Sequence, residues 1–276
     1  MARLKPLVHI LALLLLLGSC HQSDPEQSIG RIGTVVKFAG RTWDVKSSTQ
    51  PVGPGPNYFS KFYNDVWVDE YGWLHLHIAE HDGIWYSSEV VARDTFGYGT
   101  YTFTVQADPL SFAENVVFGL FTWDDSTFFS DANSEVDIEF SKWGDTASTE
   151  PLTYSVQPVN FGAFYPERTK EVAFDIQKLA GVTTHQFTWR PEIIEWKSYA
   201  GAETSGQPLT TWDFDLNHPP RRKIDGGNTS NFVIIPKPGS NTNVRMNLWC
   251  LPYQFPGPNN KMPHEVVIRA FNYTPL

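Results

Sequence analysis

The sequence contains very little cysteine and, after its first twenty residues, no long hydrophobic run. Cys20 and Cys250 are the only cysteines among 276 residues, so a small scaffold held together by several disulfides is excluded. No later apolar segment approaches the roughly 20 residues that a membrane-spanning helix needs. Positive charge is scarce as well, since 21 lysines and arginines stand against 30 acids and leave a net charge of −9. This acidic balance argues against nucleic acid, and against an anionic polysaccharide as a loosely bound partner.

The first twenty residues have the composition of an export signal. Arg3 and Lys5 precede an apolar stretch from Leu7 to Leu17 that is too short for a membrane helix. The ending Leu17-Gly18-Ser19-Cys20 resembles a bacterial lipobox, in which the cysteine is acylated and becomes the new N-terminus. An ordinary cleaved signal is the alternative, but the polar tether at 21–33 favours the lipobox. We therefore expect an exported lipoprotein without an intrachain disulfide, held by Cys20 on a membrane that faces the periplasm or the cell surface.

Residues 34–276 are expected to form one all-β domain. Short runs rich in β-branched and aromatic residues alternate with Gly, Pro, Asn and Asp, which is typical of a sandwich or jelly roll rather than an α/β sheet. Val172–Leu179 is the one candidate for a short helical turn, and the polar segment Gly201–Asn231 is expected to be an insertion at the rim. The clearest predicted strands are Trp73–Ile78, Tyr98–Gln106, Asn115–Asp124, Glu135–Ser141, Gln186–Arg190 and Val244–Trp249.

One of these strands carries an acid at every second position. The alternation puts Glu135, Asp137 and Glu139 on one face and the intervening apolar residues in the core. Three like charges on one face repel each other, so a merely solvated face is the less favoured interpretation. A retaining glycosidase needs two carboxyl groups about 5–5.5 Å apart, whereas residues i and i+4 on a flat strand lie about 13 Å apart. The two glutamates can therefore act together only on a concave sheet, onto which both lean inward.

Aromatic residues surround the acidic strand. Sugars stack their C–H faces on exposed rings, while their hydroxyl groups need polar partners. Trp123 and Trp143 flank the strand, and Trp249 ends another predicted strand, so these three are candidates for binding a saccharide. The tryptophans expected in the core are Trp43, Trp189 and Trp196.

Taken together, these motifs resemble glycoside hydrolase family 16, which includes lichenases, laminarinases and xyloglucan transglycosylases. The resemblance covers most of residues 34–276 and implies a concanavalin A-like β-jelly roll of two curved antiparallel sheets. Its most specific part is Glu135–Phe140, which fits the Glu-x-Asp-x-Glu signature. Further similar segments are Glu89 with Phe96–Gly99, Phe187–Pro191 followed by Ile194, and Met246–Trp249, whereas Tyr154–Asn160 departs from the lichenase pattern.

The resemblance implies a retaining endo-acting hydrolase of a β-linked glucan-type polysaccharide. It makes Glu135 the nucleophile, Asp137 its assistant and Glu139 the acid/base. A transglycosylase of the same family and a non-catalytic sugar-binding surface lipoprotein are the alternatives, and departures from the lichenase pattern leave the linkage open. We expect a monomer. The residues expected to contact substrate are Glu89, Trp123, Trp143, Gln157, Asn247 and Trp249.

No cofactor is expected to be required. The C-terminal acid that often helps to bind a structural calcium in the family has only a loose match here, Glu265, so no clear calcium site is predicted. His75 and His77 share a strand face, as in some metal sites, but no third ligand follows at a convincing spacing. A solvated strand face is the favoured interpretation of these histidines, and no metal site is assigned.

Overall fold

The computed structural model describes residues 34–128, 130, 132–159, 165–172, 181–220, 233–251 and 257–276. This part of the chain is all β and contains no helix, so no helix long and apolar enough to cross a membrane is found in it. The strands are β1 (Val35–Phe38), β2 (Arg41–Val45), β3 (Tyr58–Phe59), β4 (Val66–Val68), β5 (Leu74–His81), β6 (Ile84–Ala92), β7 (Gly99–Ala107), β8 (Val116–Trp123), β9 (Val136–Ser141), β10 (Leu152–Val156), β11 (Thr169–Val172), β12 (Gly181–Trp189), β13 (Ile193–Ala200), β14 (Thr210–Asp215), β15 (Asn243–Cys250) and β16 (His264–Pro275).

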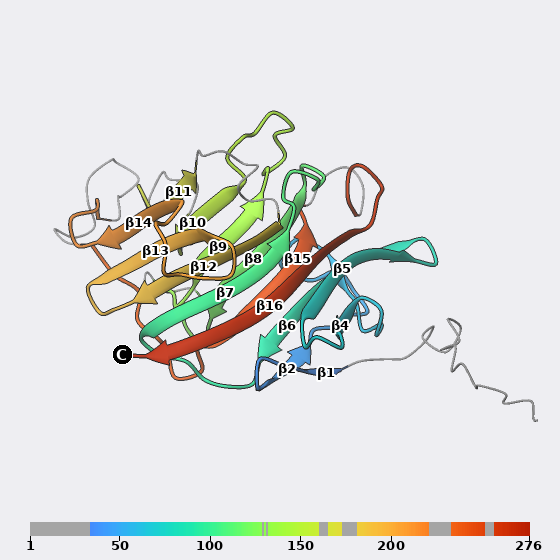
Figure 1. Ribbon diagram of the computed structural model, residues 1–276, viewed down its shortest axis with the longest axis horizontal. Helices are drawn as coiled ribbons and strands as arrows, with labels where there is room; N and C mark the ends of the chain where they lie inside the picture. The colour runs from blue at the N-terminus through green and yellow to red at the C-terminus, as the bar shows by residue number, and fades with distance from the viewer. Residues whose placement is uncertain are drawn as a thin grey trace, which may run out of the picture.

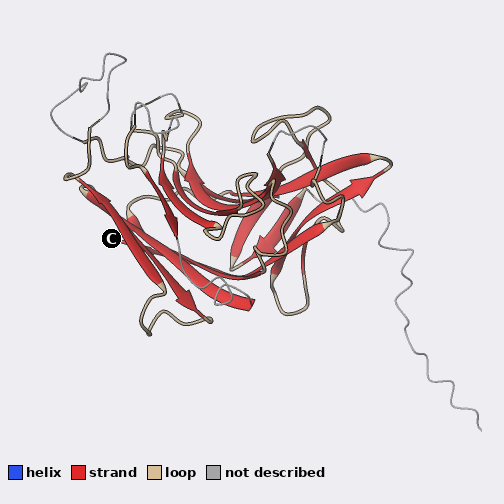
Figure 2. Ribbon diagram, turned by 90° about the horizontal axis from the view of Figure 1, so that it is seen from above, coloured by secondary structure: helices blue, strands red, loops and turns tan. Residues whose placement is uncertain are grey.

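The strands form two curved layers (Figure 1). The concave layer runs β11-β10-β9-β8-β15-β6 and continues into β2 and β1, while the convex layer runs β5-β16-β7-β12-β13-β14. The tip of the β5–β6 hairpin joins the two layers. Among the described strands only the short β3 pairs in parallel, with β6. Figure 2 shows both layers bent in the same sense, with loops rising around the concave side. The predicted all-β jelly roll of curved antiparallel sheets is confirmed.

The hydrophobic core lies between the two layers. Along β9, Val136, Ile138 and Phe140 are at most 1% exposed, so this strand turns its apolar residues inward and its acids to the opposite face, as the alternation predicts. The three tryptophans expected in the core are confirmed there as well, because Trp43, Trp189 and Trp196 are completely buried.

One segment differs from the sequence prediction, and two others lie partly or wholly outside the described residues. The predicted rim insertion Gly201–Asn231 contains β14, which extends the convex sheet beside β13. Trp212 of β14 packs against Trp196, with ring centroids 4.7 Å apart, and this contact helps to hold β14 against the sheet. The sequence did not predict this strand because the segments on either side of it are rich in Pro and Gly. Of the candidate helical turn, Val172 ends β11 and the remaining residues lie outside the described part. The predicted signal, tether and Cys20 also lie outside the described residues.

Candidate active site

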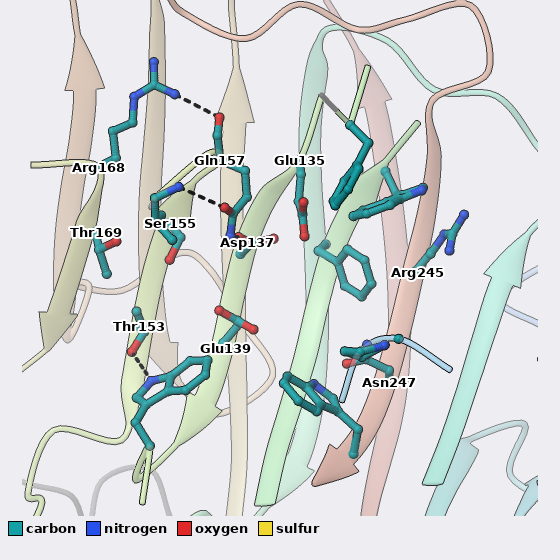
Figure 3. Close-up of a pocket in the computed structure, with 18 of the residues that line it drawn as sticks. Glu135, Asp137, Glu139, Thr153, Ser155, Gln157, Arg168, Thr169, Arg245 and Asn247 are labelled. Atoms are coloured by element: carbon teal, nitrogen blue, oxygen red, sulfur yellow. Dashed lines mark hydrogen bonds between the residues drawn. The ribbon is translucent and has the colours of Figure 1, made fainter. Parts of the chain in front are cut away.

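The solvent-facing side of the concave sheet holds a cleft of about 980 Å³ (Figure 3). Every catalytic and substrate-binding residue predicted from the sequence borders this cleft, although they come from separate strands and loops. The cleft extends on both sides of the acidic strand. It reaches Lys46 and Gly53 on one side and Thr169 and Glu171 on the other.

Strand register explains why distant residues meet in one row. Glu139 lies opposite Gly119 of β8 and Thr153 of β10. Gly119 in turn lies opposite Asn247 of β15, whose other neighbour is Glu89 of β6. A Cβ atom on Gly119 would lie 2.5 Å from Asn247 Oδ1, so this position accommodates only glycine without displacing Asn247. The row therefore brings the expected acid/base and two expected sugar contacts onto one line across the cleft floor.

A second row passes through Asp137 and contains residues that the sequence did not single out. Asp137 lies between Phe121 of β8 and Ser155 of β10, and Phe121 is followed by Arg245 of β15. Ser155 lies opposite Thr169 of β11. These residues are neighbours only because their strands are adjacent in the sheet. No short sequence motif therefore predicts that they line the cleft together.

The three acids lie in a poorly solvated position. Asp137 is 2% exposed, and Glu135 and Glu139 are half-buried. Burial raises the pKa of Asp137 to about 7. It also raises the pKa of Glu135 and Glu139 well above the ordinary range, and the neighbouring carboxylates add to the increase for both. The trio therefore retains protons at neutral pH that exposed carboxylates would lose.

The surroundings of the two glutamates differ. Asn133 Nδ2 lies 3.4 Å from Glu135 Oε2, and this hydrogen bond and the charge of Arg245 both oppose the increase in the pKa of Glu135. Gln157 Nε2 donates to Asp137 Oδ2 at 3.1 Å and likewise lowers the pKa of Asp137. No described group lowers the pKa of Glu139 in this way. Glu139 is therefore the carboxyl group best suited to keep a proton.

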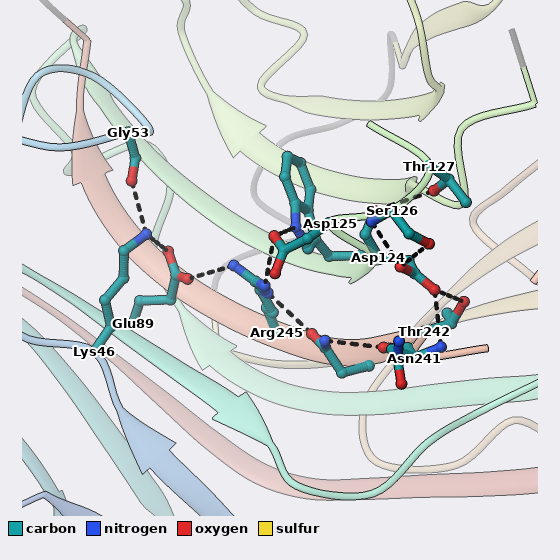
Figure 4. Close-up of polar contacts among 12 residues, drawn as sticks. Lys46, Gly53, Glu89, Asp124, Asp125, Ser126, Thr127, Asn241, Thr242 and Arg245 are labelled. Atoms are coloured by element: carbon teal, nitrogen blue, oxygen red, sulfur yellow. Dashed lines mark hydrogen bonds and ion pairs between the residues drawn. The ribbon is translucent and has the colours of Figure 1, made fainter. Parts of the chain in front are cut away.

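An ion-pair network supports one wall of the cleft (Figure 4). Glu89 is completely buried and pairs with Lys46 at 2.9 Å and with Arg245 at 3.4 Å. Lys46 also donates to the carbonyl of Gly53 at 2.7 Å, which ties the loop after β2 to this wall. The guanidinium of Arg245 lies 5.2 Å from the Trp123 ring centroid. The buried carboxylate thus holds two cations and an aromatic ring in place beside the trio.

Aromatic rings border both ends of the acidic strand. Trp143 is 36% exposed, and its indole nitrogen donates to Thr153 Oγ1 at 3.1 Å (Figure 3). A turn with positive φ at Trp143 and at Gly144 presents this ring to the cleft. At the other end, Trp123 packs against Phe128, which is 45% exposed and was not predicted as a site residue. Trp249 lies partly exposed beside the row through Glu139.

The histidines of β5 lie away from this cleft. His75 Nδ1 lies 2.5 Å from Glu265 Oε1, and its Nε2 lies 3.2 Å from Asp69 Oδ2. His77 Nε2 lies 3.6 Å from the other oxygen of Glu265. These imidazoles are paired with carboxylates, which corrects the expectation of a simply solvated face. Within the described ranges no group of three or more His, Cys, Asp or Glu side chains has the geometry of a metal site.

This cluster gives a prediction for the pH dependence of stability. The contacts with His77 and then with His75 lower the pKa of Glu265 to about 2, from 4.5. A carboxylate whose folded pKa is depressed stabilises the fold above its unfolded pKa, and this contribution is lost as the pH falls from 4.5 towards 2. Glu265→Gln should therefore lower the free energy of unfolding at pH 6 and change it little near pH 2. Urea titrations of both proteins at several pH values measure this, and an equal difference throughout would contradict it.

No family model and no curated protein matches the sequence, but solved structures match the fold along most of the chain. A β-glucanase of Bacillus licheniformis superposes with a TM-score of 0.58 at 18% identity, covering 89% of this chain and 98% of that one. A lichenase from a mouse hindgut metagenome gives 0.55 at 18% identity, with 87% and 96% covered. This chain has the β-glucanase fold. A Mycobacterium tuberculosis protein described as an immunostimulatory antigen and pseudo β-1,3-glucanase gives 0.58 at 14% identity, with 89% and 95% covered.

Proposed function

We propose that this protein is a retaining, endo-acting glycoside hydrolase of family 16 that cleaves a β-linked glucan-type polysaccharide. One observation carries the proposal: Glu135, Asp137 and Glu139 lie on the floor of one cleft with raised pKa values and unlike surroundings. Such separation of two carboxyl groups into a proton donor and a nucleophile is what acid/base glycosidases require. Because the cleft continues on both sides of the trio, it suits a chain cut internally rather than at an end.

In the proposed reaction, Glu139 gives its proton to the glycosidic oxygen while the Glu135 carboxylate attacks the anomeric carbon. The bond to the leaving sugar breaks, and a covalent glycosyl ester forms on Glu135. Glu139 then takes a proton from a water molecule, whose oxygen displaces Glu135 from the anomeric carbon. Trp123, Trp143 and Trp249 supply rings on which sugars can stack. No cofactor enters these steps.

The stereochemistry of the product tests this mechanism. Two displacements at the same carbon restore the starting configuration, so the first product should be the β-anomer. Proton NMR of the anomeric signals, recorded before mutarotation on a panel of β-glucans, xyloglucan and galactans, measures it and identifies the substrate. Early release of the α-anomer would mean that the carboxyl groups lie far enough apart to admit the water of a single displacement.

A non-catalytic sugar-binding role is the second candidate, because one solved structure of this fold is described as a pseudo β-1,3-glucanase. The buried trio favours hydrolysis over this role, since a protein that only binds sugar gains nothing from carboxyl groups that are costly to bury. A transglycosylase would use the same trio. It would lengthen an added acceptor oligosaccharide, whereas a hydrolase would only shorten the chain.

We also propose that the mature protein is a monomer exported to the periplasm or cell surface and anchored to a membrane by a lipid on Cys20. The lipobox resemblance of residues 17–20 supports this proposal. Mass spectrometry of the mature N-terminus should detect an acylated Cys20, and Cys20→Ser should release the protein or leave it unprocessed. Unacylated wild-type protein in the medium would overturn the proposed anchor.

A further inference from the structure

Gln157 lies in the loop after β10, and its backbone and its side-chain amide both form hydrogen bonds with other protein groups. Its backbone N–H donates to the carbonyl of Glu135 at 3.1 Å. Its side-chain Oε1 accepts a hydrogen bond from the backbone N–H of Val159 at 3.0 Å. Its Nε2 donates to Asp137 Oδ2 at 3.1 Å. Both ends of the amide thus contact protein groups, while the expected contact of Gln157 with sugar stays a prediction.

The contact with Val159 determines which end of the amide faces Asp137. A backbone N–H can only donate, so the atom that it meets must be the amide oxygen. The NH₂ group consequently points to Asp137, and the hydrogen-bond network settles an orientation that is otherwise ambiguous for glutamine. Asp137 therefore meets a donor and no acceptor at this oxygen, an arrangement that favours its ionised form.

Arg168 fixes the backbone of the same loop. Its Nη1 donates to the carbonyl of Gln157 at 2.9 Å (Figure 3). Its Nη2 donates to the carbonyl of Ile234 at 2.7 Å. The side chain is almost completely buried, and its guanidinium lies over the rings of Tyr165 and Phe214. The amide of Gln157 is therefore anchored at its backbone as well as at its oxygen.

Among the described residues, no group other than Gln157 donates a hydrogen bond to the carboxylate of Asp137, and this includes Ser155, which lies opposite Asp137 on β10. Its own strand contributes the acids Glu135 and Glu139, and β8 contributes the apolar Phe121. The nearest cation in the row, Arg245, lies beyond Phe121. From the convex layer, Trp196 of β13 donates only to the backbone carbonyl of Asp137.

We propose that Gln157 is a positioning residue whose fixed amide favours the ionised form of Asp137, so that the proton shared by the acidic trio stays on Glu139. An ionised Asp137 repels negative charge on Glu139 and favours its protonated form. Asp137 raises the pKa of Glu135 too, but the hydrogen bond from Asn133 and the charge of Arg245 oppose that increase, so the proton goes to the acid rather than to the nucleophile. The catalytic consequence rests on the proposed hydrolase function, whereas the proton placement does not depend on any substrate.

Titration of the carboxyl carbons by ¹³C NMR tests the proton placement without substrate. Gln157→Met keeps the length of the side chain and removes the donor, so the pKa of Asp137 should rise by about one unit. The signal is assigned by its loss in Asp137→Asn. Gln106→Met on the convex sheet, where Gln106 is exposed and bonded to Arg269, is the matched control and should leave this pKa unchanged. An unchanged pKa of Asp137 in Gln157→Met would overturn the proposal.

A wild-type measurement covers the case in which Gln157→Met does not fold. The side-chain ¹⁵NH₂ signals of Gln157 should shift with the ionisation of Asp137, and this titration should vanish in Asp137→Asn. Signals that do not titrate in the wild type would also overturn the proposal.

Kinetics then separate positioning from sugar binding. If Gln157 acts through Asp137, Gln157→Met should move the alkaline limb of the kcat/KM profile to lower pH, with KM changed less than kcat. A higher KM with an unchanged pH profile would instead make Gln157 a substrate contact and overturn its positioning role. If no glycan is turned over by the wild type, the proposed function fails, while the two titrations still decide the proton placement.

Discussion

Replacing Glu135 or Glu139 by glutamine is expected to lower turnover by about 10³-fold, while the fold is retained. Both side chains project into the cleft from a strand whose core contacts are made by Val136, Ile138 and Phe140. Glutamine has nearly the same size as glutamate, and at position 135 it also removes a charge that is costly in this half-buried place. Circular dichroism and thermal unfolding should therefore differ little from the wild type, or show a more stable protein at neutral pH.

The leaving group distinguishes the two roles. An aryl glycoside with an acidic phenol needs no proton, so Glu139→Gln should still form the glycosyl ester with it and release a burst of phenol. Glu135→Gln should give no burst, because the nucleophile is missing. Glu80→Gln, at an exposed position on β5, is the matched control and should keep full activity. Near-wild-type turnover of a polysaccharide by either cleft variant would remove the assigned catalytic role.

The second large effect is on stability. Glu89→Ala should lower the free energy of unfolding by about 3–5 kcal/mol, because it leaves two cations without their buried counter-charge. Lys46 and Arg245 are respectively only 22% and 16% exposed in their side chains, so water can replace the lost carboxylate only in part. Urea denaturation followed by tryptophan fluorescence measures the change.

Asp125 supplies the matched control for this prediction. Its carboxylate also lies near Arg245, at 3.7 Å, but its side chain is 88% exposed. Exposed ion pairs contribute little, so Asp125→Ala should cost less than about 1 kcal/mol. If both variants lowered the free energy of unfolding by similar amounts, the burial of Glu89 would not make its ion pairs more stabilising than an exposed pair.

The fold class and the acidic trio were predictable because their signals are local. The alternation in β9 depends on one short stretch of sequence, and it assigns the acids and the core residues of that strand together. Arg245 was missed because its place beside the trio depends on β15 pairing with β8, and nothing in its own neighbourhood reports that pairing. Phe128 lies in a turn-rich loop after β8. A loop has no regular alternation of buried and exposed positions, so the sequence does not indicate that this apolar side chain is exposed.

Gln157 shows a different limit of sequence interpretation. Its expected contact with sugar stays a prediction, and the family resemblance that singled it out did not indicate that its amide meets Val159 and Asp137. The identity of a residue indicates which hydrogen bonds it can make. Only the arrangement of its neighbours decides whether those bonds go to a ligand or to the protein.

The place of β16 in the convex sheet imposes an order of events on synthesis. This strand, His264–Pro275, lies between β5 and β7, which pair with it and not with each other. The ribosome makes β5 and β7 long before it makes the strand that separates them. The convex layer therefore cannot close before β16 has been made. Closing this layer brings together strands that are far apart in the sequence, so it is a late, long-range step of folding.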